Sequence, residues 1–256
     1  MACSDLGVMY KSGIEVQSDI TLARSLFERA CDLNAAVGCF NLGLLFQAGD
    51  GVDIDLEQAA TFFRMACEGG ELPGCTTLGV MRFSGEGVDP DIDEAVSLLD
   101  RACRGEEVRG CYLLGMLYDR GEGVAENDSI AASLFSKACN GGDVESCAFI
   151  GEMYFYGEGV PQNHSLAAEL IQTACDAGLA ASCFDLARMY TNGLGVNQDD
   201  AAAASYHQMA CDGGVPQGCL SLGTMHSYGI GVSRDSAKAA ALFRQACDAG
   251  LAEACR

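Results

Sequence analysis

Apolar residues recur with helical spacing in seven successive stretches of 36 residues. In each stretch small or apolar side chains take positions one, four, five and eight, as in Cys111, Leu114, Gly115 and Tyr118. This i, i+3, i+4, i+7 spacing predicts an amphipathic helix, here named helix A, and position seven, always Met or Leu, widens its buried face. We expect the Met and Tyr side chains of this face to form a structural core, not a cofactor site.

A turn and a second helix follow helix A in every stretch. Glycine stands at position eleven and valine at position fourteen, and position seventeen is always Asp or Asn. Asp and Asn side chains cap the free amides of a helix's first turn, so a second helix, helix B, is predicted to start there. Alanines seven residues apart, such as Ala59 and Ala66, leave room for a neighbouring helix. The glycines after helix B, such as Gly69 and Gly70, predict a left-handed exit.

The spacing of the cysteines defines the 36-residue repeat most sharply. The 15 cysteines are separated alternately by 28 and 8 residues, so the pattern repeats every 36 residues, as stacked solenoids do. We therefore predict an all-α solenoid of helix-turn-helix repeats that forms a single domain over residues 1–256, cut at both ends within the pattern and hence part of a longer protein. The predicted repeats are 3–38, 39–74, 75–110, 111–146, 147–182, 183–218 and 219–254.

Two cysteines eight residues apart join the end of each helix B to the start of the next helix A, which we expect to begin at the second cysteine. Disulfides are the favoured interpretation, contributing about 2.5 kcal/mol each by chain entropy. Zinc ligation and reduced core thiols stay open, although the C-x2-4-C spacing of structural zinc is absent. The predicted pairs are Cys31–Cys39, Cys67–Cys75, Cys103–Cys111, Cys139–Cys147, Cys175–Cys183, Cys211–Cys219 and Cys247–Cys255. Cys3 is left as a free thiol, and we expect end-to-end stacking or a Cys3-linked dimer.

The in-phase pattern Cys-x-x-Leu-Gly-x-Leu/Met-Tyr-x-x-Gly-x-Gly-Val, then Asp, then Ala and Ala-Cys, resembles the Sel-like repeat (SLR) family over nearly the whole chain. Its cysteine-bridged subset resembles the Helicobacter cysteine-rich proteins. The resemblance implies a right-handed α/α superhelix of disulfide-stapled hairpins, related to tetratricopeptide repeats, and an adaptor role. Four positions depart from the pattern: Glu15 for the second turn glycine, Ala187 for the helix A glycine, and Arg82 and His226 for the aromatic.

Charge narrows the range of partners. Fifteen Lys and Arg against 36 Asp and Glu give a net charge of −21, which repels phosphate backbones and anionic headgroups. We therefore predict no nucleic-acid partner and no membrane insertion. Disulfides would imply an oxidising, extracytoplasmic compartment, periplasmic or secreted, although this chain carries no export signal.

The resemblance also implies penicillin binding or weak β-lactamase activity, which calls for a serine nucleophile. A Ser-x-x-Lys motif would put serine three residues before a lysine, where this chain has Val8, Leu134 and Asp235. The triplet Lys11-Ser12-Gly13 is better explained by chance. We therefore predict no catalytic residues and no enzyme activity.

Other chemistry is weakly indicated. His164, His207 and His226 lie at different repeat positions, so no metal site and no cofactor are predicted, and His207 replaces an apolar residue of helix B. Asp91 and Glu94 are interpreted as a capping box instead of a catalytic pair.

The remaining face of helix A, positions two, three, six, nine and ten, varies between repeats and is unusually apolar. In a superhelix helix A lines the concave side, which such proteins use for binding. The main hypothesis is a non-enzymatic scaffold with a protein- or peptide-binding groove there. Its alternatives are binding of penicillin or peptidoglycan fragments, and a purely structural rod. The predicted groove residues are Asn41, Leu44, Thr77, Val80, Tyr112, Leu113, Met116, Phe149, Glu152, Phe155, Tyr156, Asp185 and Arg188.

Overall fold

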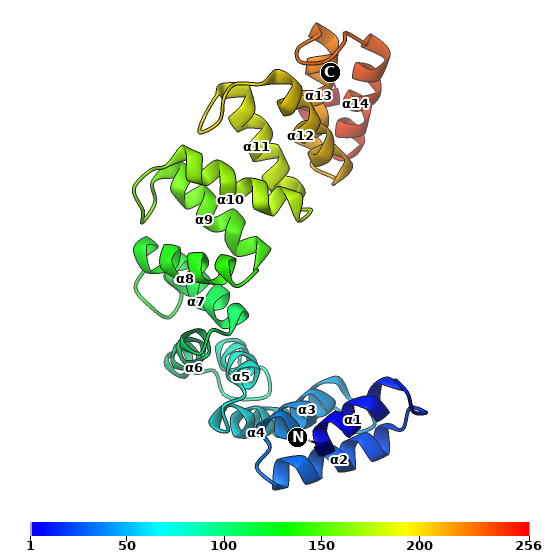
Figure 1. Ribbon diagram of the computed structural model, residues 1–256, viewed down its shortest axis with the longest axis vertical. Helices are drawn as coiled ribbons and strands as arrows, with labels where there is room; N and C mark the ends of the chain where they lie inside the picture. The colour runs from blue at the N-terminus through cyan, green and yellow to red at the C-terminus, as the bar shows by residue number, and fades with distance from the viewer. Residues whose placement is uncertain (1, 256) are drawn as a thin grey trace. The chain divides into compact units, whose positions relative to one another are not determined.

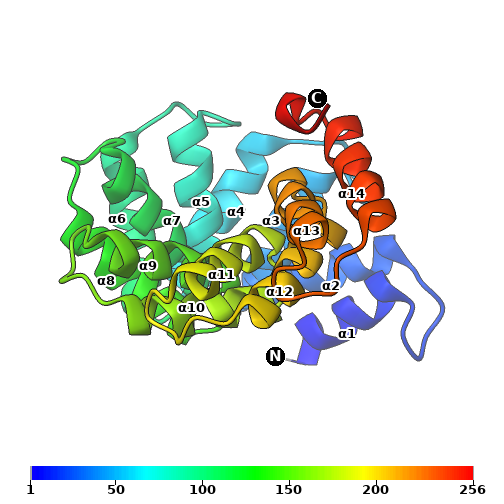
Figure 2. The same ribbon diagram turned by 90° about the horizontal axis from the view of Figure 1, so that it is seen from above.

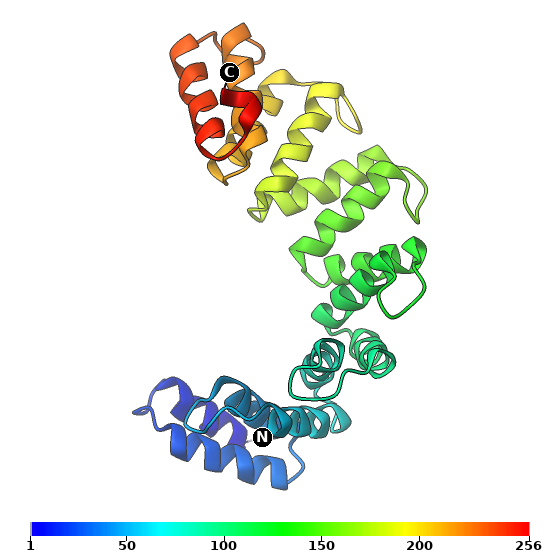
Figure 3. The ribbon, with the colours of Figure 1, turned by 180° about the vertical axis from the view of Figure 1, so that it is seen from behind.

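The computed structural model describes residues 2–255, and all regular secondary structure within these residues is helical (Figure 1). Fourteen α-helices follow one another, with one short 3₁₀ turn at the end, and consecutive helices pack pairwise within each compact unit. The predicted all-α solenoid of seven helix-turn-helix repeats is confirmed. The chain divides into two compact units, one up to residue 126 and one from residue 127 onward. Figures 2 and 3 show the hairpins from two further directions.

Odd-numbered helices are helix A and even-numbered helices are helix B. The first unit contains α1 (Ala2–Ser12), α2 (Ile20–Asp32), α3 (Ala36–Ala48), α4 (Leu56–Glu68), α5 (Leu72–Ser84), α6 (Ile92–Arg104) and α7 (Val108–Arg120). The second unit contains α8 (Asp128–Asn140), α9 (Val144–Tyr156), α10 (His164–Asp176), α11 (Ala180–Asn192), α12 (Asp200–Asp212), α13 (Pro216–Tyr228), α14 (Ser236–Asp248) and the turn η1 (Ala252–Cys255).

Helix A begins three residues before the second cysteine of each pair, so the expectation that it starts at that cysteine was wrong. The turn after helix B is shorter than the cysteine spacing suggests, and acidic side chains cap some of the earlier starts. Asp143 accepts a bond from the backbone N–H of Ser146 at 2.7 Å, and Glu107 accepts bonds from Arg109 and Gly110. Each disulfide therefore joins the last turn of helix B to the interior of helix A.

The turn between helix A and helix B has the same conformation in every repeat. The position-eleven glycine is left-handed each time, with φ between 65° at Gly121 and 80° at Gly157. The second turn glycine is also left-handed and lies against the preceding helix B: a Cβ at Gly159 would come 2.2 Å from the carbonyl carbon of Asp128. Glu15 holds this left-handed conformation with φ 62°, which is strained for a side chain with a Cβ.

All seven predicted Asp or Asn caps of helix B are confirmed. Each side chain accepts a bond from the backbone N–H three residues on, as in Gln58 N–H to Asp55 at 2.9 Å. These amide bonds lower the pKa of Asp55 and of Asp235. The predicted capping box is wrong in its second half. Asp91 caps the backbone of Glu94, but the Glu94 carboxylate is held by Arg64 at 2.8 Å and Arg82 at 2.6 Å.

The core of each repeat is built from Leu and Met of helix A against Ala and an aromatic or aliphatic residue of helix B. Phe27, Phe63 and Phe135 are fully buried. Position seven of helix A is buried from repeat two onward, whereas position eight, expected to be buried, is mostly half-buried. The helix A glycine makes room for the helix B ring, because a Cβ at Gly43 would lie 2.6 Å from Phe63 Cε1.

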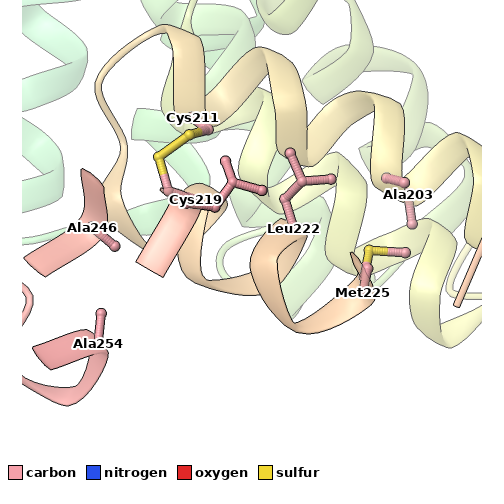
Figure 4. Packing of buried hydrophobic residues seen from close by; sticks show 9 residues of the cluster. Ala203, Cys211, Cys219, Leu222, Met225, Ala246 and Ala254 are labelled. Carbon is pink, nitrogen blue, oxygen red and sulfur yellow. A yellow bond between two sulfur atoms is a disulfide. The ribbon is translucent and has the colours of Figure 1, made fainter. Parts of the chain in front are cut away.

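The seven predicted disulfides are present. Zinc ligation and reduced thiols are therefore wrong for these fourteen cysteines, and among the described residues Cys3 is the one free cysteine. Figure 4 shows the Cys211–Cys219 bond within the core of the last repeats, with Leu222 of α13 near it and Met225 of α13 and Ala203 of α12 farther along the same cluster. Each bond fixes the join between consecutive hairpins.

Candidate functional site

The groove residues predicted in the first unit contribute partly to packing. Asn41 Nδ2 donates to the carbonyl of Val37 at 2.9 Å and the Thr77 hydroxyl donates to Pro73 at 2.9 Å, so both bind their own helix. Leu44 is half-buried against the core. Val80 is 40% exposed. The other three, Tyr112, Leu113 and Met116 on α7, are half-buried.

In the second unit, five of the six predicted groove residues line one cavity of about 180 Å³. The five are Glu152, Phe155, Tyr156, Asp185 and Arg188. The sixth, Phe149, is half-buried and stacks on Phe135 of the preceding helix B, α8, with 5.1 Å between ring centroids, so it packs α9 against the preceding repeat. The cavity lies on the helix A faces of α9 and α11, and it is the candidate site.

Helix α9 supplies one acidic and two aromatic side chains. Glu152, Phe155 and Tyr156 stand at i, i+3 and i+4, which places them on one helix face. The rings of Phe155 and Tyr156 meet edge to face at 5.0 Å, and Phe155 is also 5.0 Å from the ring of His164. Tyr156 is 60% exposed. These contacts hold the Phe155 ring in place beneath a more open tyrosine.

Helix α11 supplies the opposite wall. Asp185 and Arg188 form an ion pair at 3.5 Å, and the Arg188 guanidinium lies 5.9 Å from the centre of the Phe184 ring. Burial raises the pKa of Asp185, and the charge of Arg188 opposes that shift. Because this carboxylate is half-buried, a cation that reaches it would relieve the cost of its burial.

The lining suits a cation carried on an apolar stem. Ile171 and Met189 form an apolar floor, and the carboxylates of Glu152 and Asp185 outnumber the single guanidinium of Arg188. Aromatic faces such as Tyr156 also attract cations. A lysine or arginine side chain has this combination of stem and charge.

Four lining residues were missed by the sequence analysis: Ile171, Met189, Asn192 and Leu194. Met189 was assigned to the core, where it is buried, and Ile171 is a buried residue of helix B that the sequence analysis did not name. Asn192 stands at position ten of helix A like Tyr156, so the same register could have found it. Leu194 belongs to the turn, whose side chains the helical pattern does not place.

The lysine and serine of the Lys11-Ser12-Gly13 triplet make structural contacts. Lys11 forms an ion pair with Asp50 at 3.0 Å, and the Ser12 hydroxyl donates to the carbonyl of Val8 at 2.8 Å. Over residues 2–255 no group of three or more His, Cys, Asp or Glu side chains could hold a metal ion. Within the same residues no helix has the length and apolarity needed to cross a membrane.

Comparison with protein families identifies the repeat. The Sel1 repeat family model matches seven times and covers nearly the whole chain, at residues 1–34, 36–71, 74–106, 108–143, 144–179, 180–215 and 216–251. No curated protein sequence matches the chain significantly.

Several solved structures are similar to this chain. A protective antigen of uropathogenic Escherichia coli strains, described as displaying an SLR fold, superposes with a TM-score of 0.94 at 29% identity, covering 99% of this chain and 54% of the antigen. A Sel1 repeat protein from Oxalobacter formigenes gives 0.76 at 26% identity, covering 99% of this chain and 74% of that protein. Helicobacter pylori cysteine rich protein B is 30% identical over 51% of this chain and 93% of its own length, with a TM-score of 0.42. This chain thus spans about half the length of the E. coli antigen.

Proposed function

Because the chain belongs to the Sel1 repeat family, whose repeats generally mediate protein interactions, we propose that it is a non-enzymatic scaffold that binds an extended peptide segment of a partner protein. The segment lies along the helix A face and places a basic side chain in the cavity between α9 and α11. The compartment is extracytoplasmic, since seven disulfides require an oxidising environment.

The observation that carries the proposal is the convergence of Glu152, Asp185 and Tyr156 on one cavity with an apolar floor. Two carboxylates beside aromatic rings favour a cation, and the net charge of −21 favours basic partners in general. The disulfides and the packed Phe155 ring keep the wall rigid, so binding orders few protein side chains.

The test starts from a random peptide library displayed on phage and selected against the oxidised protein. The affinity of a selected peptide is then measured for wild type and for Tyr156→Ala. Tyr228→Ala is the matched control, because Tyr228 has the same position in α13, is 75% exposed and lies outside this cavity's lining. We expect at least a tenfold loss for Tyr156→Ala and less than a twofold change for Tyr228→Ala. Equal losses would contradict the proposal.

The peptide's charge provides a second, independent arm. Replacing its basic residue by norleucine keeps the apolar stem and removes the charge, so the affinity should fall about tenfold for wild type and little for Glu152→Gln/Asp185→Asn. Loss of a charge-assisted contact is worth about that factor. An unchanged affinity for the norleucine peptide would remove the carboxylates from the account.

The two other functions predict different outcomes. A binder of penicillin or peptidoglycan fragments would be labelled by penicillin or would hydrolyse nitrocefin, and a purely structural rod would select no peptide. Either result, with no peptide selected, would overturn the peptide-binding proposal.

A further inference from the structure

A second cavity lies beside the first, on the helix A faces of α11 and α13. Its volume is about 450 Å³, and it shares Arg188 and Asn192 with the first cavity. Its walls are mainly apolar, formed by Phe184, Leu220 and Ile230. The two cavities are therefore neighbouring hollows on one surface of the second unit.

One side chain of this cavity is buried without a hydrogen-bond partner. His207 of α12 is 4% exposed, and its Nδ1 atom makes no hydrogen bond to any described residue. Its ring lies 5.6 Å from the ring of Phe184. Burial, and secondarily the charge of Arg188, lower the pKa of His207 to about 4. The imidazole is therefore neutral near pH 7 and offers one donor and one acceptor.

Packing alone does not call for a histidine here. The equivalent helix B position holds Phe27, Phe63, Leu99, Phe135, Ile171 and Phe243 in the other repeats. Repeat six has Ala187 in place of the helix A glycine, and its Cβ takes space that a phenylalanine ring uses elsewhere. A smaller aliphatic side chain would fill the remaining space without burying an unpaired nitrogen, which destabilises a fold. The histidine thus points to a ligand.

We propose that this cavity binds the phenol of a tyrosine in the peptide held by the neighbouring cavity, with His207 bonding the hydroxyl. The proposal rests on the peptide-binding function above. The ring packs among Phe184, Leu220 and Ile230, and its hydroxyl donates to or accepts from the imidazole whichever tautomer is present. Phenylalanine would leave the nitrogen unpaired.

The first test needs no peptide. The chain has three histidines, so ¹⁵N-histidine labelling gives a separate NMR signal for each ring while p-cresol, the tyrosine side-chain analogue, is titrated. We expect saturable shifts at His207, none at His164 or His226, and binding of toluene at least tenfold weaker. Equal affinity for toluene, or an unmoved His207, would overturn the proposal.

Variants separate the hydrogen bond from the cavity. His207→Leu should stay folded, bind toluene and lose its preference for p-cresol, while His207→Gln, which retains a polar group, should keep part of that preference. A p-cresol preference unchanged in His207→Leu would refute the role of the imidazole.

Peptides separate this inference from the proposed function. A tyrosine-containing peptide selected on wild type should lose about tenfold in affinity on Tyr→Phe replacement, and this loss should vanish in His207→Leu. If p-cresol binds but no peptide is selected, the peptide assignment falls and the cavity is a site for free phenols. If selected peptides need Tyr156 but neither p-cresol nor a peptide tyrosine involves His207, this inference fails while the proposed function stands.

Discussion

The pairing of Ala187 with His207 can be tested as a steric coupling. By register, a phenylalanine at position 207 would meet the Ala187 Cβ as the other rings would meet a Cβ on their glycines, at 2.5 Å for Gly7 and Phe27, and 2.7 Å for Gly223 and Phe243. Ordinary carbon contacts are about 3.5–4.0 Å. His207→Phe therefore overlaps by about 1 Å, and overpacking of this size costs about 1–3 kcal/mol.

A double-mutant cycle isolates the energetic cost of the overlap between positions 187 and 207. The free energy of unfolding is measured in urea, with disulfides intact, for wild type, Ala187→Gly, His207→Phe and the double variant. The loss of the unpaired nitrogen is common to both arms of the cycle and cancels, so the coupling energy reports the overlap. We expect the double variant to be about 1–3 kcal/mol more stable than the sum of the single changes predicts.

Repeat two supplies the matched control. Gly43→Ala creates the same overlap with Phe63 in its native background, where the Cβ would lie 2.6 Å from the ring. Its destabilisation should equal the cost of that overlap minus about 0.5–1 kcal/mol, the amount by which alanine is favoured over glycine inside a helix. A coupling energy below about 0.5 kcal/mol at positions 187 and 207, with Gly43→Ala destabilising as expected, would refute the steric explanation of the histidine.

Three further predictions follow from single features. The pKa of His207 falls from 6.5 to about 4 on folding. Burial of the neutral imidazole therefore leaves the free energy of unfolding unaffected by its titration above pH 6.5, and up to about 3 kcal/mol of that free energy is lost as the pH falls to 4. The urea midpoint of His207→Leu should not show this fall at low pH. If the midpoints of wild type and His207→Leu changed in parallel with pH, the prediction would be contradicted. Glu15→Gly should raise the free energy of unfolding by about 1 kcal/mol by relieving the left-handed strain; an unchanged value would exclude strain. Thiol titration of unreduced, denatured protein should find only Cys3, and additional thiols would contradict the pairing.

The fold was predictable because the same sequence pattern recurs in seven repeats. Helix A, the turn glycines, the helix B caps and the disulfide pairs each recur in phase, so an error in one repeat is corrected by the others. The start of helix A was misplaced, because the residue before it is acidic in only some repeats, and among the described residues only Glu107 and Asp143 cap the helix with their side chains. The Glu94 carboxylate was misassigned for a related reason: its partners Arg64 and Arg82 come from α4 and α5, and only packing shows that they meet.

The helix A residues of the candidate site could be predicted from their repeat positions, but the residues that complete the cavity could not. Counting along helix A found Glu152, Tyr156 and Asp185, whereas the floor residue Met189 follows the same pattern as the core. The pairing of Ala187 with His207 appears in the sequence only as two separate departures. Their relation depends on the distance between a helix A glycine and a helix B ring, which no spacing along the chain gives.

The central claim is that a peptide occupies the helix A face of the second unit, and methionine methyl NMR tests it most directly without any substitution. Met189 lines the first cavity and Met225 the second, while Met81 has the same helix A position in repeat three. Titration of a selected, tyrosine-containing peptide into protein labelled with ¹³C at its methionine methyl groups should shift Met189 and Met225 saturably and leave Met81 unmoved. Saturable binding that leaves Met189 and Met225 unmoved would contradict the account.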